Sequence, residues 1–226
     1  MAELPPKETS FVAERRLLVL GTHNKKKGIE LRELLGPYGF DLRTLADFSE
    51  AIEVEETGET FAENALLKAT VQAKHLGCWV LGEDSGLAVD ALDGAPGVYS
   101  ARFSGPEATD ESNNQLLLEH LADMPLEQRG AHYTCHVVLS DPMGNVRAEW
   151  EECCRGRILF GYHGTGGFGY DPLFEIPEYH MTFGQLGYRV KAVLSHRSRA
   201  MRAIIPRLIT LAAEAWTGEL AESAKK

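Results

Sequence analysis

The first segment whose residue types could do chemistry is Gly21–Lys27, with the sequence GTHNKKK. It follows an apolar run, so we expect it to connect a strand to a helix. Such a loop can aim a hydroxyl, an amide, ammonium groups and backbone N–H groups at phosphate. It lacks the GxxxxGK[ST] spacing of a Walker loop. Considered alone, Lys25 to Lys27 fit an ordinary solvated helix start equally well.

Carboxylates gather in two further segments. Glu53, Glu55 and Glu56 precede Thr57-Gly58, and Glu83-Asp84-Ser85-Gly86 lies where we expect a strand to end. Carboxylates from two separate loops can share a magnesium ion, a hard cation that prefers oxygen ligands. Asp-Ser-Gly is also a common turn, and Glu-Glu before Thr-Gly is also typical of a solvated edge. Together with the basic loop at Gly21–Lys27, these carboxylates favour a metal and phosphate site more than they do alone.

Two later segments have features of a nucleotide site. Gly164–Pro172 has four glycines within six positions, which allow close backbone approach to a ligand, and embeds an aromatic ring among them. Ser195-His196-Arg197 lies at a predicted helix start, where Ser195 can cap and N–H groups remain free. A simple cap explains that second segment by itself. Neither a GxSxG elbow nor an HExxH helix occurs, so phosphate and magnesium chemistry is the remaining theme.

Composition excludes several other functions. The 226 residues are 44% hydrophobic, enough for one large domain or two lobes, and the net charge is −10. This charge opposes binding to nucleic acid backbones. No apolar run approaches the roughly 20 residues of a membrane span, and the N-terminal residues lack the apolar core of a signal peptide. We therefore expect a cytoplasmic protein with no nucleic acid or membrane partner.

Cysteine and histidine give no metal site by spacing. Cys78, Cys135 and the adjacent Cys153 and Cys154 form no paired CxxC motif, so we interpret them as reduced thiols in strands. His132 and His136 would lie on one face of a strand, far apart and without a third ligand.

Apolar periodicity predicts the elements that must position these segments. We expect a mixed sheet flanked by helices, an α/β fold. Pro206 should kink or divide the last helix. The expected strands are Leu17–Gly21, Trp79–Leu81 and Leu87–Ala91, with a hairpin of His132–Leu139 and Val146–Arg155; the expected helices are Lys27–Leu35, Thr60–Leu76, Asp110–Leu121 and Ser195–Trp216. We divide the chain into an N-terminal extension (1–15), a catalytic domain (16–212) and a C-terminal tail (213–226).

The chemical segments, in this order, closely resemble the inosine triphosphate pyrophosphatase family from about Leu17 to Leu208. Its T/S-x-N-x-x-K opening is matched by Thr22, Asn24 and Lys27. The other matches are the ETGxTFxENA stretch at Glu56–Ala65, the helix lysine Lys68, the D/E-D-S-G-L motif at Glu83–Leu87, GAPGxYSAR at Gly94–Arg102, GGFGYDP at Gly166–Pro172, T-x-x-E/Q-L at Thr182, Gln185 and Leu186, Lys191, and Ser195-His196-Arg197. The departures are His23 and Lys26 in place of small residues, Pro206, and the two extensions.

The resemblance implies a two-lobed α/β fold with an elongated mixed sheet, the nucleotide in the cleft between the lobes, and commonly a homodimer. It implies Mg²⁺-dependent hydrolysis of inosine, deoxyinosine and xanthosine triphosphates to the monophosphate and pyrophosphate. Asp84 would be the base, and Glu56, Glu83 and Asp84 the metal ligands. Thr22, Asn24, Lys27, Lys68 and Ser85 would bind the triphosphate, and Phe168, Gly169, Tyr170, Asp171, Lys191, His196 and Arg197 the base.

Two alternatives stay open. One is a pyrophosphatase that acts on other nucleotides, because the sequence fixes the phosphate chemistry better than the choice of base. The other is a nucleotide-binding regulatory module without turnover, which the presence of both Asp84 and Glu56 opposes.

Overall fold

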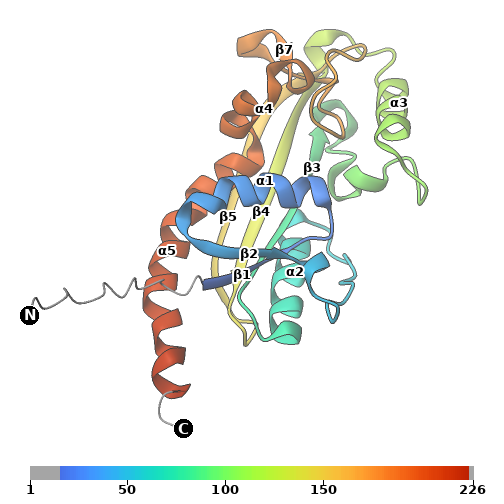
Figure 1. Cartoon of the computed structure of the whole chain (residues 1–226). Coiled ribbons are helices and arrows are strands. Elements are labelled where there is room, and N and C mark those ends of the chain that lie inside the picture. The colour runs from blue at the N-terminus through green and yellow to red at the C-terminus, as the bar shows by residue number, and fades with distance from the viewer. Residues whose placement is uncertain (1–15, 224–226) are drawn as a thin grey trace, which may run out of the picture.

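The computed structural model describes residues 16–223, and its central feature is one seven-stranded sheet (Figure 1). The strands are β1 (Arg16–Gly21), β2 (Phe40–Thr44), β3 (Val80–Val89), β4 (Gly130–Ser140), β5 (Val146–Ile158), β6 (Phe174–Ile176) and β7 (Met181–Thr182), in the order β2-β1-β3-β4-β5-β6-β7. β1 is parallel to both β2 and β3, whereas every later neighbouring pair is antiparallel. The mixed sheet confirms the predicted fold class.

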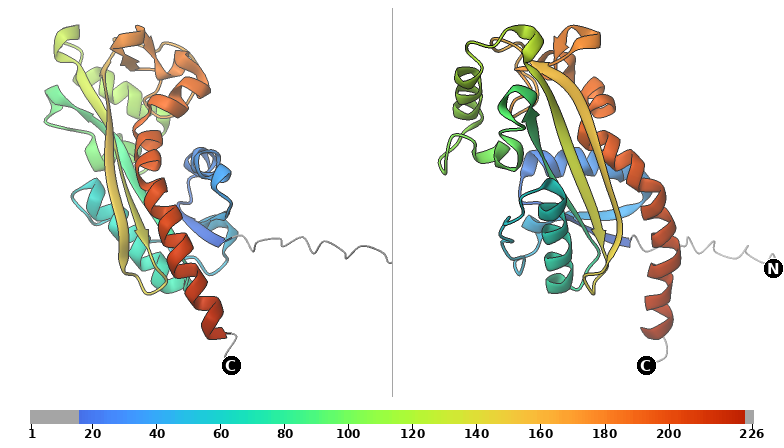
Figure 2. Two further views of the ribbon diagram at one scale, coloured as in Figure 1. Left: turned by 90° about the vertical axis from the view of Figure 1, so that its left-hand side faces the viewer. Right: turned by 180° about the vertical axis from the view of Figure 1, so that it is seen from behind.

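Helices cover both faces of this sheet (Figure 2). They are α1 (Lys25–Leu35), α2 (Phe61–Leu76), α3 (Asp110–His120), α4 (Phe183–Leu194) and α5 (His196–Ser223). On one face, Ala65 and Ala69 of α2 pack with Val138 of β4. On the other face, α1 and α5 share one core cluster, in which Met201 of α5 packs together with Leu81 of β3.

The ends of the predicted helices follow from local capping. The Thr60 side chain accepts a hydrogen bond from the backbone of Glu63, whose carboxylate returns the bond, and Gly77 ends α2 in the left-handed conformation. Asn24 caps α1 in the same way as Thr60 caps α2, through its side-chain oxygen. The hairpin turn is held by Asp141, which accepts hydrogen bonds from the turn that follows it. These helices and the hairpin are confirmed within a few residues.

The Glu83–Gly86 segment lies inside a strand and not at a strand end. The two expected short strands are parts of β3, which pairs with β4 along its whole length. Ladder bonds to β4 outweigh the local turn tendency of Asp-Ser-Gly, so the predicted strand end was wrong. Because side chains alternate along a strand, Glu83 and Asp84 point to opposite faces of the sheet.

The C-terminal half departs from the prediction in two places. α4 was not predicted, since Gly187, at a φ of 73°, interrupts its helical pattern. α5 continues beyond Trp216 to Ser223 and is not divided at Pro206, whose exposed position lets water solvate the carbonyl that loses its donor. The proposed boundary at residue 212 therefore falls inside a helix. The predicted extension, 1–15, lies outside the described residues.

The remaining predictions concern thiols and membranes. None of the four cysteines forms a disulfide within residues 16–223; three lie in β4 and β5, whereas Cys78 lies in the turn before β3. Within residues 16–223, none of the helices is long and apolar enough to cross a membrane.

Candidate functional site

The site lies beyond the carboxyl end of β1. β1 pairs with β3 only as far as Gly21 and Gly82, and β3 continues past this point. The connection after β1 runs through α1 on one face, and the connection into β3 runs through α2 on the other face. In open α/β sheets, ligands bind in the crevice that such a reversal leaves at the carboxyl ends of the strands.

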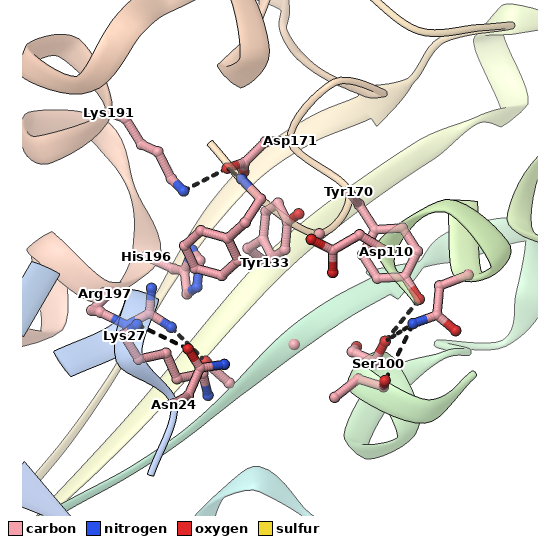
Figure 3. Close-up of a pocket in the computed structure, with 16 residues that line it drawn as sticks. Asn24, Lys27, Ser100, Asp110, Tyr133, Tyr170, Asp171, Lys191, His196 and Arg197 are labelled. Carbon is pink, nitrogen blue, oxygen red and sulfur yellow. Dashed lines mark hydrogen bonds and ion pairs between the residues drawn. The ribbon is translucent and has the colours of Figure 1, made fainter. Parts of the chain in front are cut away.

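Two adjoining pockets occupy this crevice. The acidic pocket is lined by four carboxylates, Glu53, Glu56, Glu83 and Asp84, together with Thr22, His23, Lys68, Gln72 and Arg102. The aromatic pocket (Figure 3) is lined by Tyr133, Phe168, Gly169, Tyr170, Asp171, Lys191, His196 and Arg197. Asn24, Lys27, Ser85 and Ala101 line both pockets and therefore lie where they meet. Every predicted site residue lines at least one of them.

Asp84 is the centre of the acidic pocket. The Lys68 Nζ lies 2.8 Å from Asp84 Oδ1 and 3.0 Å from Glu56 Oε1, so one ammonium group bridges two carboxylates. Gly82 makes this approach possible, because a Cβ at Gly82 would lie 2.6 Å from the Ala65 carbonyl oxygen of α2. The lack of a side chain at Gly82 therefore lets α2 bring Lys68 to Asp84.

The second oxygen of Asp84 is buried and has no hydrogen-bond partner among the described residues. Burial raises the pKa of Asp84 above its ordinary value, despite the opposing charge of Lys68. The pKa of Lys68 is also raised: burial would lower it, but Asp84 and Glu56 outweigh that effect. Lys68 therefore keeps its charge, while Asp84 has a free oxygen and an increased affinity for a proton.

Glu83 has the opposite environment. Lys27 Nζ lies 3.0 Å from its Oε1, Ser85 Oγ donates to the same oxygen over 2.7 Å, and Arg197 Nε donates to Oε2. These partners outweigh the burial and hold the pKa of Glu83 well below its usual range. Arg197 also pairs with Glu30 of α1, so a charged network connects α1, β3 and α5.

The loop before α1 is held by its own side chains. Asn24 Oδ1 accepts from the Lys26 and Lys27 amides, and Thr22 Oγ1 accepts from the Asn24 amide. These amides are occupied, so the expected display of backbone N–H groups is wrong for these three positions. The groups of this loop that face the pockets are the side chains of Thr22, Asn24 and Lys27.

Asp171 organises the glycine-rich loop of the aromatic pocket. Its Oδ2 accepts from the Phe168 amide over 2.8 Å and from Lys191 Nζ over 2.6 Å. Gly167 is required here, because it has a φ of 77° and its Cβ would lie 2.0 Å from that same oxygen. Lys191 Nζ also lies 4.3 Å from the centre of the Phe168 ring. The loop thus holds an aromatic ring at the pocket wall.

His196 follows the cap of α5. Ser195 Oγ accepts from the Ser198 amide, as predicted for a cap. The His196 ring stacks on Tyr133 with centroids 4.7 Å apart and an angle of 9° between the planes, and its Nδ1 is buried without a partner in the described chain. Burial, followed by the charge of Arg197, lowers the pKa of His196 well below its usual range. The imidazole is therefore neutral at pH 7.

Tyr170 lines the aromatic pocket and Lys26 lies near its Phe168 ring, and both have structural partners that spacing did not reveal. The Tyr170 hydroxyl donates to the Ser100 carbonyl over 2.9 Å, so this hydroxyl anchors the loop. Lys26, one of the departures from the family pattern, pairs with Asp110 of α3 at 3.1 Å and lies 5.4 Å from the centre of the Phe168 ring. Lys26 and Asp110 are exposed and connect α1 to α3 beside the aromatic pocket.

The three predicted metal ligands do not form one group. Among residues 16–223, no three histidine, cysteine or acidic side chains gather in a metal-binding arrangement. Glu56 and Asp84 meet at Lys68, whereas both oxygens of Glu83 are taken by cations on the other face of β3. Glu83 is held as the anionic partner of Lys27 and Arg197, and its role as a metal ligand stays a prediction.

Sequence reasoning missed three contributors. Glu30 of α1 contacts Lys191 at 3.2 Å as well as Arg197, and no spacing within α1 signals these two contacts. Tyr133 lies on the same strand as His132, and no local pattern marks it. Arg102 ends the GAPGxYSAR motif, yet received no role.

The model of the Ham1 family matches residues 18–207. The chain belongs to the Ham1 family. A Ham1 protein from Staphylococcus aureus has a similar solved structure, with a TM-score of 0.77 at 34% identity, over 85% of this chain and 98% of that one. A Ham1 protein from Coxiella burnetii gives a TM-score of 0.78 at 35% identity, over 88% and 100%.

Curated relatives in the Ham1 family carry a functional name. The dITP/XTP pyrophosphatase of Rhodopirellula baltica is 58% identical over 86% of this chain and 93% of its own length. The dITP/XTP pyrophosphatase of Thermus thermophilus is 48% identical over 83% of this chain and 89% of its own length. These relatives agree with the family resemblance of the motifs.

Proposed function

We propose that this Ham1 protein is a nucleotide pyrophosphatase that hydrolyses noncanonical purine nucleoside triphosphates (ITP, dITP and XTP) to the monophosphate and pyrophosphate with Mg²⁺. The observation that carries the proposal is the free, buried oxygen of Asp84 beside Lys68 and Glu56, in an acidic pocket that adjoins an aromatic one. The dITP/XTP pyrophosphatase names of the similar proteins support the substrate class.

The two pockets suit the two halves of a nucleotide. The purine would enter the aromatic pocket and stack on Phe168, and the triphosphate would extend into the acidic pocket. Asn24, Lys27 and Ser85 line both pockets, so their polar groups would contact the phosphate nearest the sugar. Thr22 and Lys68 line only the acidic pocket and would contact the phosphates of the triphosphate that lie further from the sugar.

The neutral His196 gives a basis for choosing the purine. Its unpartnered Nδ1 carries a proton in one neutral tautomer and can then donate to a 6-keto oxygen. Adenine presents an amino donor at this place, and two donors facing one another in a buried pocket leave both unpaired. Such a mismatch supports large selectivity ratios.

The reaction needs one proton acceptor and a stabilised leaving group. Asp84 would accept a proton from the water whose oxygen attacks the α-phosphorus, since a positioned carboxylate can act as a general base. The bond between the α-phosphorus and the bridging oxygen breaks, and that oxygen leaves with pyrophosphate. The leaving group is already charged, so the cations around it matter more than a general acid.

A magnesium ion fits beside Asp84. The unpartnered buried oxygen of Asp84 would be a ligand for the ion. The Glu56 carboxylate lies nearby, because it contacts the same Lys68 ammonium group as Asp84 does. Mg²⁺ in proteins is commonly held by one or two carboxylates with waters and substrate phosphates. Glu56 and Asp84 would hold it, and its charge would neutralise phosphate oxygens when substrate is bound. Lys68 keeps its charge beside them and supports the same phosphates.

Labelled water tests the reaction class. With ITP and Mg²⁺ in H₂¹⁸O, we expect pyrophosphate as the product and the label in the inosine monophosphate. Release of orthophosphate, or label in the pyrophosphate, would contradict attack at the α-phosphorus. A protein that binds ITP without turnover would instead be a regulatory module.

Assembly and location are part of the same proposal. We propose a homodimer that acts on the cytoplasmic nucleotide pool, on the basis of the family resemblance. Sedimentation equilibrium at micromolar concentration tests the dimer, and a monomer mass would contradict it.

A further inference from the structure

The cations of the acidic pocket differ in whether a carboxylate already neutralises them. Lys27 is paired with Glu83, and Lys68 with Glu56 and Asp84. Arg102 also lines this pocket, yet within residues 16–223 it forms no ion pair. It is the uncommitted guanidinium of a pocket whose other lysine and arginine cations are occupied.

The position of Arg102 suits the far end of the triphosphate. It ends the short helix η4 (Gly97–Arg102), is exposed, and lines the acidic pocket but not the aromatic one. Its guanidinium carbon lies 5.2 Å from the centre of the Tyr99 ring, which supports the side chain without using its hydrogen-bond donors. Because Arg102 is exposed, its free donors are accessible to a ligand that enters or leaves the acidic pocket from solvent.

The balance of charge in the acidic pocket favours phosphate binding by Arg102. The acidic pocket is lined by four carboxylates against Lys27, Lys68 and Arg102, so without a ligand it has no surplus of lysine and arginine charge. A triphosphate adds further negative charge, and a cation without an internal carboxylate partner can direct all of its charge and donors toward it. A guanidinium also matches phosphate oxygens in a bidentate geometry.

We propose that Arg102 binds the β- and γ-phosphates of the substrate and holds the pyrophosphate product. This inference rests on the proposed function and adds a residue for the leaving group. It separates the pocket into an inner part, where Asp84 faces the reacting phosphate, and an outer part, where Arg102 receives the departing pyrophosphate.

Calorimetric binding tests this assignment with the full-length protein and Mg²⁺. Arg102→Ala should weaken the binding of inorganic pyrophosphate by about tenfold or more, the size expected for a charge-assisted hydrogen bond, and leave inosine monophosphate binding little changed. Arg102→Lys should restore part of the affinity, because lysine keeps the positive charge but lacks the bidentate donors of the guanidinium. Arg207→Ala serves as the matched control, since Arg207 is an exposed arginine of α5 that lines neither pocket.

Two results would overturn the proposal: pyrophosphate binding by Arg102→Ala that equals the wild type, or an equal loss for pyrophosphate and monophosphate. Arg102 is exposed, so its truncation leaves the buried core unchanged, and Arg102→Lys gives an independent comparison. Failure of the wild-type protein to hydrolyse ITP would contradict the proposed function and is measured separately from these binding ratios.

Discussion

Glu83 and Asp84 are adjacent carboxylates with opposite environments. Glu83 faces α1 and α5, where lysine, arginine and serine donors satisfy both of its oxygens. Asp84 faces α2, where Lys68 binds one oxygen and the other has no partner among the described residues. The pKa of Glu83 is accordingly lowered well below its usual range, and that of Asp84 is raised. One strand thus carries a structural anion and a reactive one.

The same difference separates the two pockets. The aromatic pocket is prepared before any ligand arrives, because Asp171 already fixes Lys191 and the Phe168 amide, and Glu83 already fixes Arg197. The acidic pocket leaves one oxygen of Asp84 unpartnered and Arg102 without an ion pair in the described chain. A site that recognises a base needs fixed donors, whereas a site that receives phosphate and metal needs groups whose partners arrive with the ligand.

The largest expected effect is on turnover. Asp84→Asn removes the proton acceptor and should lower kcat by about 10²-fold to 10⁴-fold, while nucleotide binding persists. Steady-state kinetics with ITP measure it, with Asp93→Asn as the control, because Asp93 is an exposed aspartate outside both pockets. A kcat for Asp84→Asn equal to that of the wild type would remove Asp84 from the mechanism.

The second effect is on stability. Glu83→Gln leaves Arg197 and Lys27 without their anion and should lower the free energy of unfolding by about 3 kcal/mol at pH 7. Because the folded pKa of Glu83 is lowered, this contribution is present above the unfolded value, about 4.3, and is lost as the pH falls through the folded pKa. Urea unfolding at pH 7 and near pH 3 measures it. A difference that persists unchanged in acid would contradict the charge-based account.

A third change concerns the metal. Glu56→Gln replaces a carboxylate ligand with a neutral amide and should raise the Mg²⁺ concentration for half-maximal rate by roughly tenfold. Glu83→Gln should leave that concentration unchanged, because Glu83 is occupied by cations. A magnesium titration of both variants distinguishes them, and the reverse result would return Glu83 to the metal site.

The smallest expected effect is on the free energy of unfolding of Asp84→Asn, and its sign is opposite to that expected for Glu83→Gln. Asp84 has a raised folded pKa, so its charge costs stability once the pH exceeds the unfolded value, and that cost is complete above the folded pKa. Asp84→Asn should therefore increase the free energy of unfolding at pH 7 by on the order of 1 kcal/mol. Destabilisation of this variant would show that the Lys68 pair outweighs the burial of the carboxylate.

Local patterns predicted the parts of the fold whose cause is local. Thr60 and Gly77 mark the ends of α2 through capping chemistry, and Asp141 marks the hairpin turn. β2 was not predicted, although Phe40, Asp41, Leu42 and Arg43 alternate between apolar and charged residues as in a half-buried strand. A run of five residues leaves this pattern ambiguous, and the parallel pairing with β1 fixes the strand.

For the site, the sequence allowed us to predict which residues line the pockets, but not which residues they contact. The motifs contain every residue that we assign to base, phosphate and metal, although they gave Arg102 no role. The predicted strand end grouped Glu83 with Asp84, whereas the continuous β3 places the two side chains on opposite faces by alternation alone. The Glu30 contacts with Lys191 and Arg197 join elements far apart in the sequence, so spacing did not reveal them.

The most direct test of the account is the ratio of kcat/KM for ITP to that for ATP, with pyrophosphate as the measured product. The prepared aromatic pocket offers the buried, neutral His196 as the donor for a 6-keto oxygen, so we predict a ratio of at least ~10² in favour of ITP. The same pyrophosphate product from both substrates, at a ratio near one, would contradict base recognition by this pocket and leave the chain a general nucleotide pyrophosphatase.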